Sequence, residues 1–482
     1  TTAIAGAVVA APSIWTSRKA GAAQAPIPTV NDPRFSVPVI DPANIGKFID
    51  PLPVPDLVGT NWPVIGAGSE TIRLVERNVQ ILPSTLGLNT TVWCYRGDDD
   101  YTSTFLGPTM LADSGKRVNV DYDYSGLRGE QIHLLRRGNN PNQSVVDLHV
   151  HGTDLGEPQV RFIAHLHGSA GVSPDSDGYA EAWVTPDGVI GDTPRGTRPI
   201  THDATQKHMY RNAQGAALIW YHDHALGITR LNVYAGGAGG YIITDDVEAG
   251  YIASGQLPDL GIPLVIQDRM FYPDGRLAYP DLDAVAAGLI AQRGCTPWPN
   301  LDVSTRPEYF GDVIVVNGKV WPFLNVEPAV YRFRFLNGCN SRVLDLSFEA
   351  PQPPVFAIIG TEGGFLPGPS DVRSNIVIGP AERFDVLFDF PHQAANTLTL
   401  SNKGAKKPFP GGTPPSPQSD ALVMQFRVAL TTTRPVLAAP PARWNPNTPP
   451  ASGTTRRVLL YEGVDQFGCI RPLVGTLSPS TG

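Results

Sequence analysis

The sequence has little of several features, and each shortage narrows what the protein can be. No apolar stretch is long enough to cross a bilayer, so we expect no transmembrane segment. The net charge is −8 and no basic run occurs, which argues against a nucleic-acid partner. Four cysteines with no close spacing allow up to two disulfides but indicate no pairing: Cys94, Cys295, Cys339 and Cys469.

Glycine and proline, by contrast, are abundant, with 49 and 47 residues, while charged residues make up only 17% of the chain. This composition is typical of many short strands joined by turns, and it predicts an all-β fold. A chain of 482 residues is too long for one hydrophobic core and suits two or three domains.

Histidine is scarce, but its distribution is not random. The strings HLHG, from His165, and WYHDH, from Trp220, hold four of the ten histidines as two His-x-His pairs. Ten histidines scattered at random would form roughly 0.2 such pairs, whereas this sequence has three. We therefore take these four residues as candidate metal ligands: His165, His167, His222 and His224.

Strand geometry explains why this spacing suits metal ions. Residues i and i+2 of a strand share a face at roughly 6.5 to 7 Å, and neighbouring strands lie about 4.8 Å apart. Two paired His-x-His strands would place four imidazoles at the corners of a small rectangle. A metal–nitrogen bond is only about 2 Å long, so the arrangement suits a cluster of ions. Imidazole binds Cu, Zn, Fe and Ni, so the histidines alone do not identify the element.

The residues around both strings favour strands. In VRFIAHLHG, residues 160–168, apolar side chains alternate with Arg161 and the histidines, and a glycine ends the strand. The run ALIWYHDH, residues 217–224, is typical of a buried strand. For the third pair, His149 and His151, we expect a structural role, because it lies in a polar segment close before the first string.

Longer stretches of the sequence resemble one known family. Multicopper oxidases contain segments similar to AHLHGSAGVSPDSDGYAEAW, GAALIWYHDHALGITRLNVYAGGAGGYII, EYFGDVIVVNGKVWPFLNVEPAVYRFRFLNGCNSR and VIGPAERFDVLFDF. The likeness is to the bacterial branch of spore-coat laccases, phenoxazinone synthase and, more distantly, bilirubin oxidase. It runs from about Ile45 to the end of the chain. It implies tandem cupredoxin-like domains, three in the intact family, with a type 1 copper in the third and a trinuclear copper cluster between the first and the third.

The resemblance also implies roles for single residues. His165 matches the family's type 2 copper ligand, and three residues match ligands of the type 3 copper pair: His167, His222 and His224. Asp177, in SDGY, matches an acidic residue that family members place near the cluster to assist proton delivery to oxygen. Alternatively, Asp177 only caps a turn with Gly178, and the sequence does not decide between these two roles.

The remaining ligands of the family are not found in this sequence. In the family, the third domain supplies a histidine triplet and a His-Cys-His motif. After His224 this chain has one histidine, His392, and none of its cysteines precedes a histidine. A type 1 copper needs a thiolate and two imidazoles. We therefore expect a fragment that lacks most of the third domain and is inactive as an oxidase by itself.

For the intact protein, the resemblance implies a laccase-like oxidoreductase that acts on a small aromatic substrate and dioxygen. A phenol or aromatic amine would lose electrons singly at the type 1 copper, and dioxygen would be reduced to water at the cluster. Two other classes remain open: a copper-free cupredoxin-fold export or scaffold protein, and a two-domain copper oxidase or nitrite reductase. The retained His-x-His pairs disfavour the first, and the missing Cys-His site disfavours the second. A cuprous oxidase is also disfavoured, because there are only four methionines and no Met-rich segment.

The N-terminus indicates where the protein works, and the resemblance predicts the domain boundaries. Residues 1–25 resemble the remnant of an export signal, because an apolar stretch is followed by AAQA, which has the form of a cleavage site. We therefore expect an exported protein, with a disordered Ala-rich tail as the alternative. The expected domains are a first cupredoxin domain with an extended N-terminal arm at 26–249, a second at 250–430, and a linker with the start of a truncated third domain at 431–482.

Overall fold

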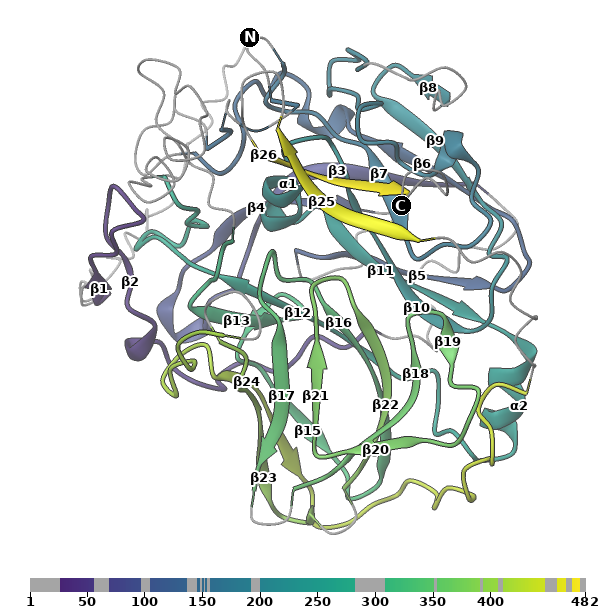
Figure 1. Cartoon of the computed structure of the whole chain (residues 1–482). Helices are drawn as coiled ribbons and strands as arrows, with labels where there is room; N and C mark the ends of the chain where they lie inside the picture. Colours follow the sequence, from purple (N-terminus) through teal and green to yellow (C-terminus); the bar gives the residue numbers. More distant parts are fainter. Residues whose placement is uncertain are drawn as a thin grey trace, which may run out of the picture.

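The computed structural model describes residues 27–55, 69–96, 105–136, 145–147, 150, 152–153, 157–191, 200–281, 308–350, 353–390, 393–405, 411–446, 457–464 and 470–476. Strands dominate these residues and form two bodies of paired sheets, one before and one after the helix α2 (Asp246–Ala253) (Figure 1). The all-β fold predicted from the composition is confirmed.

The first body is a sandwich of a four-stranded and a five-stranded sheet. Its strands are β3 (Ser69–Val79), β4 (Thr90–Arg96), β5 (Gly107–Asp113), β6 (Val118–Asp123), β7 (Ala164–His167), β8 (Ile200–His202), β9 (Thr205–Tyr210), β10 (Ala217–Asp223) and β11 (Ala238–Thr244). The sheet orders are β5-β11-β10-β7 and β4-β3-β6-β9-β8. Tyr221 on β10 packs against Tyr95 on β4 and Tyr122 on β6, with ring centroids 5.5 and 6.1 Å apart. The two sheets therefore face each other across an aromatic core.

The second body repeats this plan with larger sheets. Its strands are β12 (Ile262–Arg269), β13 (Val313–Val316), β14 (Lys319–Val320), β15 (Phe323–Val326), β16 (Val330–Asn337), β17 (Leu344–Glu349), β18 (Phe356–Thr361), β19 (Gly364–Phe365), β20 (Asp371–Arg373), β21 (Asn375–Ile378), β22 (Arg383–Asp389), β23 (Thr397–Asn402) and β24 (Leu422–Val428). One sheet has the order β14-β13-β12-β16-β22-β18-β19, with β20 beside β18, and the other the order β15-β24-β23-β17-β21. Phe388 of the first sheet contacts Phe348 of the second edge to face, with ring centroids 4.9 Å apart. Phenylalanines thus fill this core as tyrosines fill the first.

Residue patterns explain which strands are covered on one face and which on both. In β6, Val118, Val120 and Tyr122 are buried while Asn119 between them is exposed, as expected for a strand with one face on the core. β10, in contrast, is buried along its whole length. Its second face is covered by the second body, because β22 and β19 contact it. The strand that carries His222 and ends one residue before His224 therefore lies at the junction of the two bodies.

A short helix joins the two bodies. Asp245 caps the N-terminus of α2 by accepting a hydrogen bond from the Glu248 backbone amide at 2.8 Å. The Glu248 side chain is buried and pairs with two arginines of β16, Arg332 at 2.8 Å and Arg334 at a closer distance. The domain boundary predicted at 249–250 falls inside this helix.

The N-terminal arm, residues 27–55, is extended and lies mainly against the second body. It contains the strand pair β1 (Thr29–Val30) and β2 (Val39–Ile40). The Ile40 amide donates to the Phe271 carbonyl at 2.8 Å, and the Leu52 amide donates to the Phe323 carbonyl at 2.7 Å. The arm therefore precedes the first sandwich in sequence but is hydrogen-bonded to the second.

The segment that we predicted as a linker packs against the protein instead of crossing solvent. Trp444 is fully buried and contacts Tyr251 of α2 and Phe365 of β19, with ring centroids 5.3 and 5.9 Å apart. Beyond it lies an antiparallel hairpin of β25 (Val458–Val464) and β26 (Ile470–Thr476). Within the described part of the chain, no helix has the length and apolar character needed to span a membrane.

Candidate metal centre

The two His-x-His strings lie on neighbouring strands. β7 and β10 pair antiparallel, with His165 opposite His222 and His167 opposite Trp220. On β7, Ala164 and Leu166 are buried in the core, so both histidines project from the opposite face, as the alternation predicts.

The predicted strand over residues 160–167 is shorter than expected, because β7 begins only at Ala164. Just upstream, the Phe162 amide and carbonyl pair with Val184 instead of with β10. The Ile163 amide donates to the Asp223 carboxylate at 3.0 Å. The backbone therefore changes its hydrogen-bond partner from Val184 to β10 immediately before the first ligand pair. At the change, the Asp223 carboxylate accepts the hydrogen bond that a strand carbonyl would otherwise accept.

The four imidazoles form one cluster. Between strands, the ring centroids of His165 and His224 are 5.1 Å apart, those of His165 and His222 5.4 Å, and those of His167 and His222 5.5 Å. Within each strand the two rings are 5.7 and 5.8 Å apart. The ligand nitrogens of His165, His167 and His222 all lie within 4.8 Å of one another. His222 Nε2 and His167 Nδ1 are only 3.4 Å apart, close enough for one ion to bind both at a bond length of about 2 Å.

Hydrogen bonds orient two of these rings in the way that metal ligation requires. His222 Nδ1 donates to the Asp223 carbonyl at 2.7 Å, and His165 Nδ1 donates to the Asp177 carbonyl at 2.5 Å. A ring that donates from Nδ1 keeps a free lone pair on Nε2, the usual arrangement of histidine at metal sites. His224 Nδ1 is buried and finds no hydrogen-bond partner among the described residues. The donors present therefore fit a metal ion of the kind that imidazole prefers.

Burial also keeps three of the imidazoles neutral. It lowers the pKa of His222 well below the usual value and lowers the pKa of His224 as well. The pKa of His167 falls to about 4, first through burial and then through the nearby positive charge of Arg383. A neutral imidazole is the form that binds metal ions, so these rings need no deprotonation near neutral pH.

Asp177 combines features of both roles that the sequence left open. Its side chain is 53% exposed, and its Oδ1 lies 3.6 Å from His165 Nδ1. Gly178, the next residue, has a φ of +81°, and a Cβ there would approach the Ala164 carbonyl oxygen to 2.3 Å. Asp177 therefore sits in a tight turn against β7, with its carboxylate between solvent and a candidate ligand. Its role in proton delivery stays a prediction.

Other residues that support the site were missed at the sequence level. Asp223 is buried and accepts hydrogen bonds from Asn232 Nδ2 at 2.8 Å and from the amides of Ile163 and Ala225, each at 3.0 Å. Burial raises the pKa of Asp223 to about 7. Trp220 stacks near His222, with ring centroids 4.1 Å apart. Asp223 and Trp220 belong to the WYHDH string, so their proximity was a usable signal, but nothing local indicated Asn232.

The other histidines and the cysteines that the structure describes lie outside this cluster. His133 is buried and hydrogen-bonded to Asn232 Oδ1 at 2.9 Å, and burial lowers its pKa to about 3. His208 is buried with its Nδ1 at 2.8 Å from the Ser176 carbonyl, and His202 is exposed on β8. Cys94 and Cys339 are buried thiols. Five predicted positions lie outside the described residues: His149, His151, His392, Cys295 and Cys469.

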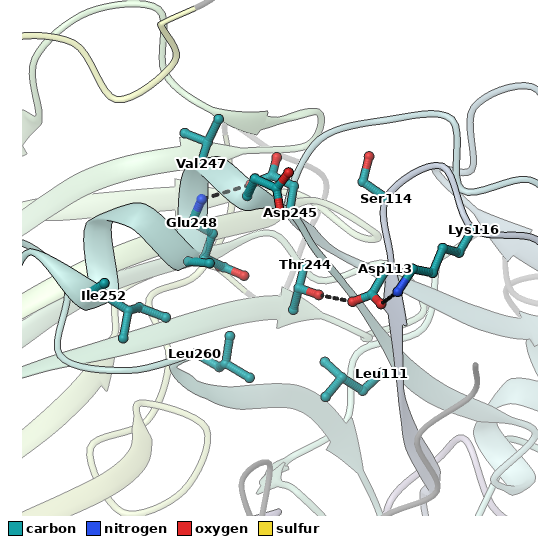
Figure 2. Close-up of a pocket in the computed structure, with 13 residues that line it drawn as sticks. Leu111, Asp113, Ser114, Lys116, Thr244, Asp245, Val247, Glu248, Ile252 and Leu260 are labelled. Carbon is teal, nitrogen blue, oxygen red and sulfur yellow. Dashed lines mark hydrogen bonds and ion pairs between the residues drawn. The ribbon is translucent and has the colours of Figure 1, made fainter. Parts of the chain in front are cut away.

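A separate cavity lies away from the histidines, beside α2 (Figure 2). It has a volume of about 800 Å³ and includes Asp113, which pairs with Lys116 at 2.5 Å and accepts from Thr244 Oγ1 at 2.9 Å. Its lining residues are Leu111, Asp113, Ser114, Lys116, Thr244, Asp245, Asp246, Val247, Glu248, Ala249, Ile252, Ala253 and Leu260. None of the candidate ligands lines it, so the metal centre is not part of this cavity.

Known proteins that resemble this chain share its fold. No family model matches it. A laccase from Bacillus stratosphericus is 36% identical over 447 residues, which cover 89% of this chain and 76% of that protein. A laccase from Bacillus subtilis is 36% identical over 396 residues, or 79% of this chain and 65% of that protein. The crystal structure of a multicopper oxidase from the hyperthermophile Aquifex aeolicus matches with a TM-score of 0.60 and 24% identity, over 88% of this chain and 73% of that one.

Proposed function

The chain belongs to the multicopper oxidase family, and from that premise we propose that it contributes four histidine ligands to a copper centre that reduces dioxygen. One observation carries the proposal. Four imidazoles, three on the paired strands β7 and β10 and one directly after β10, lie with neighbouring ring centroids 5.1 to 5.8 Å apart, so their nitrogens surround a space suited to more than one ion. We assign His165 to the type 2 copper and His167, His222 and His224 to the type 3 pair.

Bound copper would supply the redox chemistry, taking electrons one at a time from a phenol or aromatic amine and passing four of them to dioxygen, which leaves as water. The protein's own residues provide position and protons. The backbone carbonyls of Asp177 and Asp223 accept hydrogen bonds from Nδ1 of His165 and His222 and hold these two rings in the required tautomer. The Asp177 carboxylate, which is exposed yet 3.6 Å from His165, is placed to take protons from solvent and release them toward the cluster.

The proposal includes a second component that carries the other ligands. The sequence has one histidine beyond His224 and no cysteine that precedes a histidine, so the Cys-His motif of a thiolate–imidazole copper site is not among its 482 residues. We propose that a further cupredoxin-type domain supplies this site and the missing cluster ligands. By ligand count, the 482-residue chain alone would bind copper weakly and turn over no substrate. An exported location is part of the same proposal.

Copper binding and oxygen consumption together test the proposal. The chain is loaded with Cu²⁺, its metal content is measured, and oxygen uptake with a methoxyphenol is followed with and without a separately produced cupredoxin domain that carries a Cys-His copper site. We expect copper on the chain alone and oxygen uptake only in the mixture. His202→Ala, an exposed histidine of β8, is the matched control for His222→Ala. Turnover by the chain alone would show that the ligand count is wrong, and a copper-free chain would contradict the site.

A further inference from the structure

One buried arginine of the second body reaches the histidine strands of the first. Arg383 begins β22, and its side chain is only 3% exposed. Its Nε donates to the Leu218 carbonyl of β10 at 3.2 Å, across the junction between the two bodies. Leu218 lies four residues before His222 on the same strand, so this bond holds the backbone that carries the ligand.

The same guanidinium also lies against the end of β7. Gly168 directly follows His167, and a Cβ at this glycine would be 2.6 Å from Arg383 Nη2. Gly168 has a φ of +89°, so the chain turns here and leaves room for the guanidinium. One side chain is therefore hydrogen-bonded to β10 and lies beside the glycine that follows β7.

The orientation of Arg383 is set by its own body. Its Nη1 donates to the Ala381 carbonyl at 2.9 Å and pairs closely with the Glu362 carboxylate, and its Nη2 donates to the Glu362 carbonyl at 3.2 Å. The Glu362 carboxylate also accepts from the Arg383 backbone amide at 2.8 Å. With five donors in a rigid fork, arginine can satisfy these acceptors and Leu218 together, whereas lysine cannot.

We propose that Arg383 is a positioning residue for the metal centre: held by Glu362 and Ala381, it fixes β10 at Leu218 and β7 at Gly168, and so sets the spacing of His167 and His222. This inference rests on the proposed function, since it concerns the same four ligands. Docking of the second body thereby determines how well the ligands of the first are arranged. Residues that orient ligands from outside the metal's own shell typically change metal affinity by about 10- to 100-fold when lost.

Two readouts on the whole chain test this inference. The first is Cu²⁺ affinity, measured against a competing chelator. The second is hydrogen–deuterium exchange of β7 and β10 in the metal-free protein, which needs no copper. For Arg383→Met we expect Cu²⁺ to bind about tenfold more weakly and both strands to exchange faster. For Arg383→Lys we expect a Cu²⁺ affinity and exchange rates between those of Arg383→Met and the native protein, because lysine keeps the charge but lacks the forked set of donors.

Arg334→Met is the matched control. Arg334 is also fully buried in this sheet, on β16, but it contacts Glu248 and the Leu260 carbonyl instead of the histidine strands. It should lower stability without changing Cu²⁺ affinity or exchange in β7 and β10. If Arg383→Met does not fold, Arg383→Lys and Glu362→Gln carry the same test, because the Glu362 side chain is 47% exposed.

The outcomes separate this inference from the proposed function. Unchanged exchange and affinity in the Arg383 variants, or equal effects in Arg334→Met, would overturn the positioning role. If the native chain binds no Cu²⁺, the proposed function fails, and the exchange measurement still decides whether Arg383 holds the two strands.

Discussion

The two sandwiches contain different kinds of buried polar cluster. In the second, the buried Arg342 pairs with Asp268 at 3.1 Å and with Asp420 at 3.0 Å, so each buried carboxylate has a cationic partner. In the first, four imidazoles are brought together, the carboxylate beside them at Asp177 is exposed, and His224 Nδ1 has no hydrogen-bond partner among the described residues. Buried ion pairs of this kind help to stabilise a fold. Imidazole nitrogens that lie close together without hydrogen-bond partners can instead bind a ligand. The difference distinguishes a structural cluster from a candidate site.

Breaking these buried ion pairs should have the largest effect on stability. Arg342→Met leaves Asp268 and Asp420 buried without their cation, which typically costs about 3 to 5 kcal/mol. We expect urea unfolding to show this loss while Cu²⁺ affinity is unchanged. A loss below about 1 kcal/mol would mean that water enters this core and compensates the carboxylates.

Acid should destabilise the first sandwich through a buried histidine outside the cluster. Because the pKa of His133 is about 3 in the folded protein and about 6.5 when unfolded, the unfolded state takes up the proton first as pH falls. The contribution of neutral His133 to the free energy of unfolding is therefore complete above about pH 6.5. It is lost as pH falls toward 3, by up to about 1.4 kcal/mol per pH unit. We expect His133→Gln to flatten this part of the stability profile. An unchanged slope would contradict the assignment.

Removing one ligand should weaken the metal centre more than it weakens the fold. His222→Ala takes away a nitrogen that lies 3.4 Å from that of His167, so Cu²⁺ affinity should fall by at least about tenfold. Without metal, the free energy of unfolding should change by only about 1 to 2 kcal/mol, because the ring has few polar partners to lose. Chelator competition measures the first quantity and urea unfolding the second. Equal copper affinity in His222→Ala and His202→Ala would contradict the cluster.

The smallest effect is expected at Asp177. Its backbone carbonyl, not its carboxylate, accepts the hydrogen bond from His165. Asp177→Asn should therefore change Cu²⁺ affinity by less than about threefold, within the range of surface substitutions. In the chain combined with a cupredoxin domain that carries a Cys-His copper site, the same variant should slow oxygen reduction if the carboxylate delivers protons. A large loss of copper would show that the side chain acts as a ligand or an orienting group.

What the sequence could predict was local. A spacing of two residues on apolar strands indicated that His165 and His167 share a face, as do His222 and His224, and the paired strands have this arrangement. The partners of these strands could not be predicted in the same way. Residue periodicity tells which face is buried but not which distant segment covers it, so the contact of Arg383 with Leu218, 165 positions apart, left no sequence signal.

The partners of the extended arm could not be predicted from the sequence either, and they are synthesised after the arm. Residues 27–55 leave the ribosome before any strand of either sandwich, yet Ile40 and Leu52 are hydrogen-bonded to Phe271 and Phe323. The first sandwich can begin to form while Ile40 and Leu52 still lack these hydrogen-bond partners. These two hydrogen bonds can form only after the second sandwich has been synthesised. Part of the first-made segment of the chain is therefore fixed in a late step of folding.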